Sequence, residues 1–207
     1  MRMHIVEIRE PSSAPFSLMR RLKEQTARAH RLTEEAARWT AEGAELEAYV
    51  RYLVRLYGFL EPLEQRLESV LGNETSVVDL RGRGKRGWLE RDLRHFAIDP
   101  SDLPRWSGTA QLAASTDRGL GCAYVLEGST LGGRLLARQV QRRWGLGPES
   151  GAAFLAGYGD AVGARWREFG ARVDRHGQET PAAAHDVVLG AGETFSALTL
   201  WLRGGDA

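Results

Sequence analysis

The sequence predicts an all-α protein with one domain, and three observations lead to this prediction. Apolar residues recur with a period close to 3.6 over several long stretches. No stretch shows the alternation of apolar and polar residues that a half-buried strand requires. The 207 residues suffice for a substantial core. We therefore expect a helical domain over residues 17–207, after an extended or disordered lead-in over residues 1–16 that contains Pro11 and Pro15.

The first two helices are predicted from their apolar faces. Ser17 can cap a helix that runs to about Thr40, and Gly43 separates it from a second helix over about residues 44–71. Pro62 is expected to bend the second helix. The face of the first helix consists of Leu18, Leu22, Thr26, Ala29, His30 and Thr33.

Five further helical segments are predicted after a polar, glycine-containing loop over residues 72–84. A proline-containing turn at residues 99–106 and a glycine-containing turn at residues 145–151 interrupt them. Thr180 followed by Pro181 marks the start of the last helix. The segments lie at about residues 88–96, 109–114, 118–140, 152–175 and 181–202.

The composition argues against several classes of protein. Apolar residues make up 43% and charged residues 27% of the chain, as in ordinary globular proteins, and the formal net charge of +1 argues against a nucleic-acid binder. The single cysteine, Cys122, excludes an internal disulfide and a multi-cysteine metal site. The chain has no HExxH motif, no apolar run long enough to span a membrane and no signal-peptide core near its start. We therefore expect a cytoplasmic protein that binds neither nucleic acid nor membranes.

The segment Arg118–Val140 combines helical spacing with interior glycines. An interior glycine costs about 1 kcal/mol relative to alanine, so Gly128, Gly132 and Gly133 together cost roughly 3 kcal/mol. Gly121, Gly128 and Gly132 are separated by seven and four residues, which leaves one flank of the helix without side chains. Close packing against another helix, a bend, or a flat ligand against the peptide groups would each explain this flank. Glycine spacing alone favours packing.

His30 has the most distinctive surroundings on the first helix, although a lone histidine on an apolar face is usually a core residue. Glu34 at i+4 can accept a hydrogen bond from one ring nitrogen and leave the other free to bind a metal. Lys23 lies two turns earlier on the same face, about 10 Å along the axis, and Arg20 and Arg21 add positive charge. On their own these cations indicate only a solvated face. Together with a neutral imidazole oriented by a carboxylate, they suit an iron porphyrin whose propionates reach the basic end.

Two segments resemble the haem oxygenase family: LKEQTARAHRLTE (residues 22–34) and YVLEGSTLGGR (residues 124–134). The likeness is closest to bacterial biliverdin-producing members that occur with bacteriophytochromes, and it extends more weakly to TPAAAHDVVLGAGETF (residues 180–195). Neither motif is unique, but the pair in this order, in an all-α chain of this length, is fairly specific. The resemblance implies a haem-oxygenase-like helical bundle, with haem sandwiched between the first helix and a kinked glycine-rich helix.

The resemblance also implies roles for single residues. His30 would be the proximal iron ligand and Glu34 its partner, while Lys23 would contact a propionate. Phe195 would pack at the haem edge, and Arg167 matches the family only across a gap. The implied haem-contacting residues are Lys23, His30, Glu34, Tyr124, Arg167 and Phe195, and the glycines against haem and bound O2 are Gly128, Gly132 and Gly133.

One position departs from the family pattern. Many members have an aspartate directly after the first glycine of the distal helix, where it anchors the water network that delivers protons to bound O2. This chain has Ser129 there. A hydroxyl can hold water but is a poor proton reservoir. Either the water chain is anchored elsewhere, as in the bacteriophytochrome-linked relatives, or turnover is impaired, or Ser129 is a plain surface serine.

The activity that the resemblance implies is O2- and reductant-dependent cleavage of haem to biliverdin, CO and Fe²⁺, with haem as both substrate and cofactor. A reductase or ferredoxin-type protein would be the external electron donor, and the products would serve a bacteriophytochrome, iron supply or both. A non-catalytic haem carrier on the same scaffold is the alternative that the missing aspartate favours. A third interpretation is a thiaminase-like enzyme with Cys122 as nucleophile. The apolar or small neighbours of Cys122 in sequence favour a buried core thiol instead.

Overall fold

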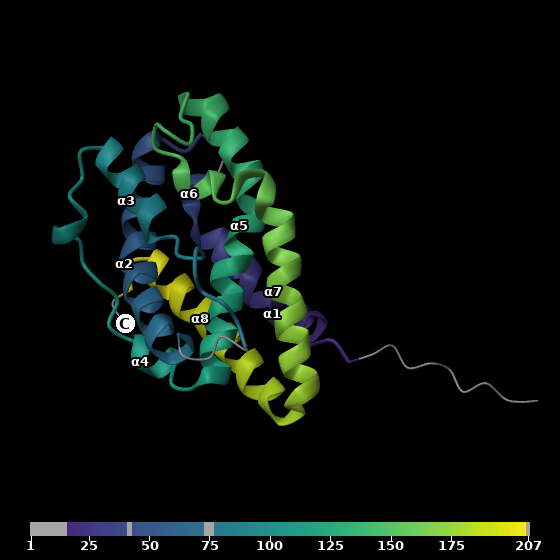
Figure 1. The fold of residues 1–207 in the computed structure, drawn as a ribbon. Helices are drawn as coiled ribbons and strands as arrows, with labels where there is room; N and C mark the ends of the chain where they lie inside the picture. The colour runs from purple at the N-terminus through teal and green to yellow at the C-terminus, as the bar shows by residue number, and fades with distance from the viewer. Residues whose placement is uncertain (1–15, 41–42, 73–76, 206–207) are drawn as a thin grey trace, which may run out of the picture.

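The computed structural model describes residues 16–40, 43–72 and 77–205, and every regular element within these ranges is a helix. The predicted all-α class is therefore confirmed (Figure 1). The predicted lead-in lies outside the described residues except for Phe16. None of the described helices is long and apolar enough to cross a membrane. The helices are α1 (Leu18–Ala36), η1 (Arg38–Thr40), α2 (Leu46–Leu71), α3 (Arg86–His95), η2 (Pro100–Asp102), α4 (Thr109–Leu112), α5 (Thr116–Trp144), α6 (Ala153–Ala156), η3 (Gly159–Ala161), α7 (Val162–Glu179), η4 (Pro181–Ala183) and α8 (Ala184–Leu202).

The ends of the two site-bearing helices follow local sequence signals. The Ser17 hydroxyl accepts a backbone N–H three residues further on at 3.1 Å, so the predicted cap does begin α1. The Ser115 hydroxyl caps α5 in the same way, because it accepts the backbone N–H three residues further on at 3.3 Å. α5 ends at Gly145, whose φ of 71° is a left-handed conformation that glycine adopts without strain.

The predicted helix over residues 152–175 is broken near its start. α6 ends before Gly157, η3 follows, and α7 begins only at Val162. Gly157 and Gly159 have φ values of 51° and 55°, which residues with a side chain rarely adopt and which end a regular helix. The break allows the short α6 to pack against the middle of α5.

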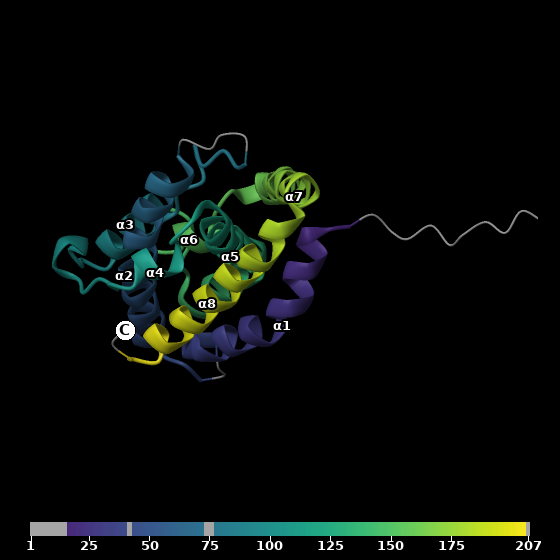
Figure 2. The same ribbon diagram turned by 90° about the horizontal axis from the view of Figure 1, so that it is seen from below.

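α8 is the helix that joins the two halves of the site region, because it packs against both α1 and α5 (Figure 2). On one side the Thr33 hydroxyl of α1 donates to the Phe195 carbonyl oxygen at 3.2 Å. On the other side the Thr194 hydroxyl donates to Cys122 Sγ of α5 at 3.2 Å. Direct contact between α1 and α5 is sparse in the described part of the chain. In both views α2 and α3 lie on the side of α5 away from α1 (Figures 1 and 2).

α5 and α8 cross at a point where each presents a glycine. A Cβ at Gly121 would collide with the carbonyl oxygen of Val187, and a Cβ at Gly190 would collide with that of Arg118. Two helix backbones approach this closely only where side chains are missing. The packing explanation is therefore correct for Gly121. Of the three glycines on the predicted flank, Gly121 packs against α8 and does not form part of an open surface.

We expect Gly121→Ala to lower the free energy of unfolding by about 1–3 kcal/mol, the usual cost of forcing a methyl group into a close-packed contact. Helix propensity alone predicts the opposite sign, a gain of about 1 kcal/mol. Thermal unfolding followed by circular dichroism measures the difference. Gly192→Ala is the control, because a Cβ on that α8 glycine meets no atom within 4 Å. A higher melting temperature for Gly121→Ala than for the unmodified chain would contradict the crossing geometry.

Candidate functional site

The imidazole of His30 faces solvent rather than the core. Its side chain is 52% exposed, and its Nδ1 lies 3.6 Å from Glu34 Oε2, which is an ion-pair distance but longer than a hydrogen bond. Its Nε2 has no hydrogen-bond partner among the described residues. The Phe195 ring and the imidazole are nearly perpendicular, with ring centroids 5.4 Å apart and ring planes 85° apart. The structure thus brings together three predicted residues, and one ring nitrogen remains available to a ligand.

Two of the predicted glycines leave the flank of α5 open. A Cβ at Gly132 would meet no atom within 4 Å, and a Cβ at Gly128 would meet only the ring of Trp166, at 3.9 Å. Neither glycine is therefore required by protein packing. An interior glycine without a packing reason indicates a backbone that something else must approach.

Gly133 has a packing partner within the protein. A Cβ at Gly133 would collide with the carbonyl oxygen of Leu155 in α6, so its missing side chain serves helix packing. Because successive helical residues are about 100° apart, Gly133 points in a different direction from Gly132. Its place against haem stays a prediction.

The register between α1 and α5 places His30 level with this glycine flank. Near one end the Tyr124 hydroxyl lies close to the Thr26 side chain, which acts to lower its pKa. Beyond the other end of α1, Gln139 Nε2 donates to the Thr40 carbonyl oxygen at 3.4 Å. The two helices therefore run in the same direction, and His30, one turn after Thr26, is level with the part of α5 that follows Tyr124 by one turn. That part begins at Gly128.

Trp166 of α7 is a site residue that the sequence interpretation missed. Its ring centroid lies 5.7 Å from that of Tyr124 and 5.9 Å from that of Phe169. Together with its approach to Gly128, these contacts close the α7 side of the glycine flank. Burial raises the pKa of Tyr124, and the Thr26 side chain acts in the opposite direction. Spacing could not single out Trp166 from the other tryptophans, because only the break before α7 brings it against α5.

The Ser129 hydroxyl is hydrogen-bonded within its own helix. It donates to the Leu126 carbonyl oxygen at 2.7 Å, and the neighbouring Thr130 hydroxyl donates to the Glu127 carbonyl oxygen at 2.8 Å. Such bonds compete with the regular helix ladder. With its one hydrogen used in this way, Ser129 can accept a hydrogen bond from water but has no proton to offer it.

Lys23 and Arg167 are exposed cations on neighbouring helices, α1 and α7. In the part of the chain that the structure describes, no hydrogen bond or ion pair joins either of them to another side chain. Both are thus available to an anionic group, but the structure does not bring either one into contact with His30. Their assignment to the propionates remains a prediction.

Cys122 is fully buried, and burial raises the pKa of its thiol to about 11. The hydrogen bond from the Thr194 hydroxyl lowers this pKa, but its effect is smaller than that of burial. At neutral pH the thiol is therefore protonated and is a poor nucleophile. This argues against the thiaminase-like interpretation.

We expect Cys122 in the native protein to resist iodoacetamide at pH 8, because both its burial and its raised pKa keep the reactive thiolate scarce. Mass spectrometry of the intact chain, before and after addition of guanidinium chloride, measures the modification. Labelling should appear only in the denatured sample. Complete labelling of the native protein within minutes would restore Cys122 as a candidate nucleophile.

The site consists of the available imidazole of His30, the Phe195 ring in contact with it, and the flank of α5 without side chains at the same level. These features define a helical protein suited to a flat ligand that carries a metal. Among the described residues no three His, Cys, Asp or Glu side chains could together hold a metal ion. The residues present fit an iron porphyrin, because His30 offers the axial nitrogen and Gly128 and Gly132 leave room for a flat ring.

The chain belongs to the haem oxygenase family, because the family model described as "Heme oxygenase" matches residues 16–204. A relative named "Heme oxygenase", from Xanthomonas campestris pv. campestris (strain 8004), is 30% identical over 159 residues, which cover 73% of this chain and 87% of the relative. Family membership confirms the resemblance seen in the two sequence segments and implies haem binding.

Solved structures show the same fold. The NO- and CO-bound haem oxygenase from Neisseria meningitidis has a TM-score of 0.72 and 23% identity over 91% of this chain and 92% of that chain. The haem oxygenase from Leptospira interrogans has a TM-score of 0.76 and 20% identity, with coverage of 91% and 100%. Haem oxygenase 2 from Chlamydomonas reinhardtii, solved without haem, has a TM-score of 0.76 and 17% identity, with coverage of 91% and 97%.

Proposed function

We propose that this protein cleaves haem, with O2 and an external reductant, to biliverdin, CO and Fe²⁺. The observation that carries the proposal is the solvent-facing His30 level with the open flank of α5 at Gly128 and Gly132. A reductase or ferredoxin-type protein would supply the electrons. The bilin would serve a bacteriophytochrome, the iron would serve cellular supply, or both. Family membership supports the haem chemistry, whereas the products and partners rest on the proposal.

The residues of the chain bind and orient the substrate. His30 Nε2 would hold the haem iron, with Glu34 favouring the ring orientation that keeps this nitrogen free. Phe195 limits how far the imidazole can tilt, because the two rings are already in edge contact. When bound, haem supplies the redox-active iron and the ring that is opened.

The function of the glycine flank depends on its absent side chains. Without side chains at Gly128 and Gly132, this flank of α5 would leave room for a flat macrocycle and let its peptide groups limit the space beside it. Trp166 closes one side of this space against water. Ser129 can accept a hydrogen bond from a water, so the protons must come from other donors through that water.

A non-catalytic haem carrier is the second candidate, and the Ser129 hydrogen bond favours it. A hydroxyl that donates to its own helix provides no proton at the place where many family members have an aspartate. Haem binding would then be intact while ring opening failed. The two candidates differ in product and not in affinity.

Titration of the purified protein with hemin, followed by addition of ascorbate or a ferredoxin–reductase pair in air, tests the proposal. We expect a Soret band at one hemin per chain, its loss under reductant and O2, and biliverdin and CO among the products by chromatography and gas analysis. A stable Soret band under the same conditions would identify a carrier. Failure to bind hemin at all would reject both candidates.

A further inference from the structure

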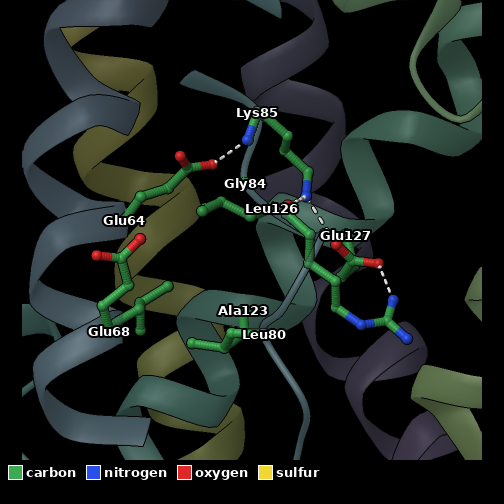
Figure 3. Close-up of a pocket in the computed structure, with 10 residues that line it drawn as sticks. Glu64, Glu68, Leu80, Gly84, Lys85, Ala123, Leu126 and Glu127 are labelled. Carbon is green, nitrogen blue, oxygen red and sulfur yellow. Dashed lines mark hydrogen bonds and ion pairs between the residues drawn. The ribbon is translucent and has the colours of Figure 1, made fainter. Parts of the chain in front are cut away.

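A cluster of buried charged side chains lies behind the glycine flank. Glu127, which directly precedes Gly128, accepts hydrogen bonds from Lys85 Nζ at 2.7 Å and Arg83 Nη1 at 2.6 Å (Figure 3). Tyr158 Oη donates to the same carboxylate at 2.9 Å. Lys85 is 1% exposed, Glu127 3% and Arg83 4%. Arg83, Lys85, Glu127 and Tyr158 are called the Glu127 cluster below.

The Glu127 cluster connects α5 to three other parts of the fold. Arg83 Nη2 lies 3.1 Å from a carboxylate oxygen of Glu168 in α7. The backbone N–H of Lys85 donates at 2.6 Å to Glu64 of α2, whose pKa is raised mainly by burial. Tyr158 belongs to the turn before α7. A carboxylate held by three donors from two segments, the loop before α3 and the turn before α7, has little freedom to shift. Charge-assisted hydrogen bonds are short and strong in a buried setting.

The segment of α5 that follows Glu127 needs such support. Its glycines weaken the helix, and the Ser129 and Thr130 hydroxyls compete for its backbone carbonyl groups. Behind this segment lie the Glu127 cluster at its start and the close approach of Gly133 to α6 further on. Glu127 lies about 140° around the helix from Gly132, so the cluster supports the flank from the opposite side.

The cavity beside the Glu127 cluster is too small for a macrocycle. Its volume is about 40 Å³, and Glu64, Leu80, Lys85, Leu126 and Glu127 are among the residues that line it (Figure 3). A buried water needs about 10–15 Å³ of such space, so a few waters fit and haem does not. Among the described residues no hydrogen bond or ion pair joins the cluster to His30, so its influence on the site passes through α5.

We propose that the Glu127 cluster is a positioning device, which holds the flank at Gly128 and Gly132 at the distance from His30 that haem requires. Without it the helix persists, but the flank moves and no longer restricts the ligand. Glu127 directly precedes Gly128, so removing its hydrogen-bond partners should change the position of this flank before that of other parts of α5. The proposal rests on the proposed function for one of its three measurements, the amount of reductant consumed per haem opened.

The double variant Glu127→Gln/Lys85→Met tests the proposal. It removes one positive and one negative buried charge together, so no unpaired charge is left by the exchange itself. Tyr158→Phe removes a single hydrogen bond to Glu127 and is the milder variant, should the double variant fail to fold. Leu89→Ala is the matched control for general destabilisation, because Leu89 is fully buried in α3, which packs on α2 and α6.

Three measurements separate positioning from stability. Amide hydrogen exchange of the haem-free protein, read for peptides covering residues 126–134, should accelerate at least about tenfold in the double variant and less in Tyr158→Phe. The hemin affinity should fall about tenfold or more. The amount of reductant consumed per haem opened should rise about twofold or more, because a misplaced flank wastes electrons.

In Leu89→Ala, adjusted in temperature to an equal fraction folded, all three quantities should match those of the unmodified chain. Equal exchange at residues 126–134 in the double variant and in Leu89→Ala would overturn the proposal, and so would an unchanged hemin affinity. If the unmodified chain opens no haem, the proposed function fails. Exchange and affinity still decide whether the Glu127 cluster positions α5.

Discussion

His30→Ala is expected to abolish haem turnover, with a loss of at least about 100-fold, and to leave the fold intact. The imidazole is the one axial donor in the described site, and even the loss of a residue that only supports a metal ligand costs about 10–100-fold. The side chain is 52% exposed, so its removal should change the free energy of unfolding by no more than about 0.5 kcal/mol. Hemin titration, product chromatography and thermal unfolding measure the three quantities.

A partial return of the hemin spectrum on addition of free imidazole would show that His30 acts as an axial ligand. His185→Ala is the matched control, because His185 is an exposed histidine in the first turn of α8, and it should bind and cleave haem like the unmodified chain. Normal turnover by His30→Ala would contradict the proposed site. A loss of helical structure in that variant would contradict the exposed placement of the ring.

Substitutions at the adjacent glycines of α5 should change stability in opposite directions. Gly132→Leu is expected to raise the free energy of unfolding of the haem-free protein by up to about 1 kcal/mol, because leucine is the better helix former and its Cβ meets no atom within 4 Å. Gly133→Ala is expected to lower it by about 1–3 kcal/mol, because its Cβ meets the Leu155 carbonyl oxygen, which cannot rotate away.

The same pair should separate binding from stability. Gly132→Leu places a bulky side chain on the open flank, so its hemin affinity should fall at least about tenfold although the protein melts at a higher temperature. Gly133→Ala should bind hemin nearly as tightly as the unmodified chain wherever it is folded. Differential scanning fluorimetry and hemin titration provide both readings. Equal hemin affinity for Gly132→Leu and the unmodified chain would show that haem does not lie against this flank.

Much of the fold was predictable from the sequence, because helices depend on local signals. The Ser17 cap begins α1 as predicted, and the all-α class follows from periodicity alone. The break between α6 and α7 was missed, because positive φ at Gly157 and Gly159 leaves no mark in a pattern of apolar residues. A glycine is compatible with helix, turn and close contact alike.

The candidate site was predictable in part. His30 with Glu34 at i+4 is a local pair, and family resemblance added Phe195, which the structure places against the imidazole. Trp166 and the Glu127 cluster were not predictable, since their contacts join segments up to 85 residues apart in sequence, as between Arg83 and Glu168. Spacing within one helix carries no information on partners at such separation.

By itself the sequence determined a set of helices, a lone imidazole with a neighbouring carboxylate, and a helix rich in glycine. The tertiary structure decided which glycines are filled by protein and which remain open: Gly121 lies against α8, Gly133 lies against α6, and Gly132 faces open space. The reason is that periodicity determines the angle at which each residue leaves the helix axis. Which atoms fill the space in that direction depends on helices that are distant in the chain.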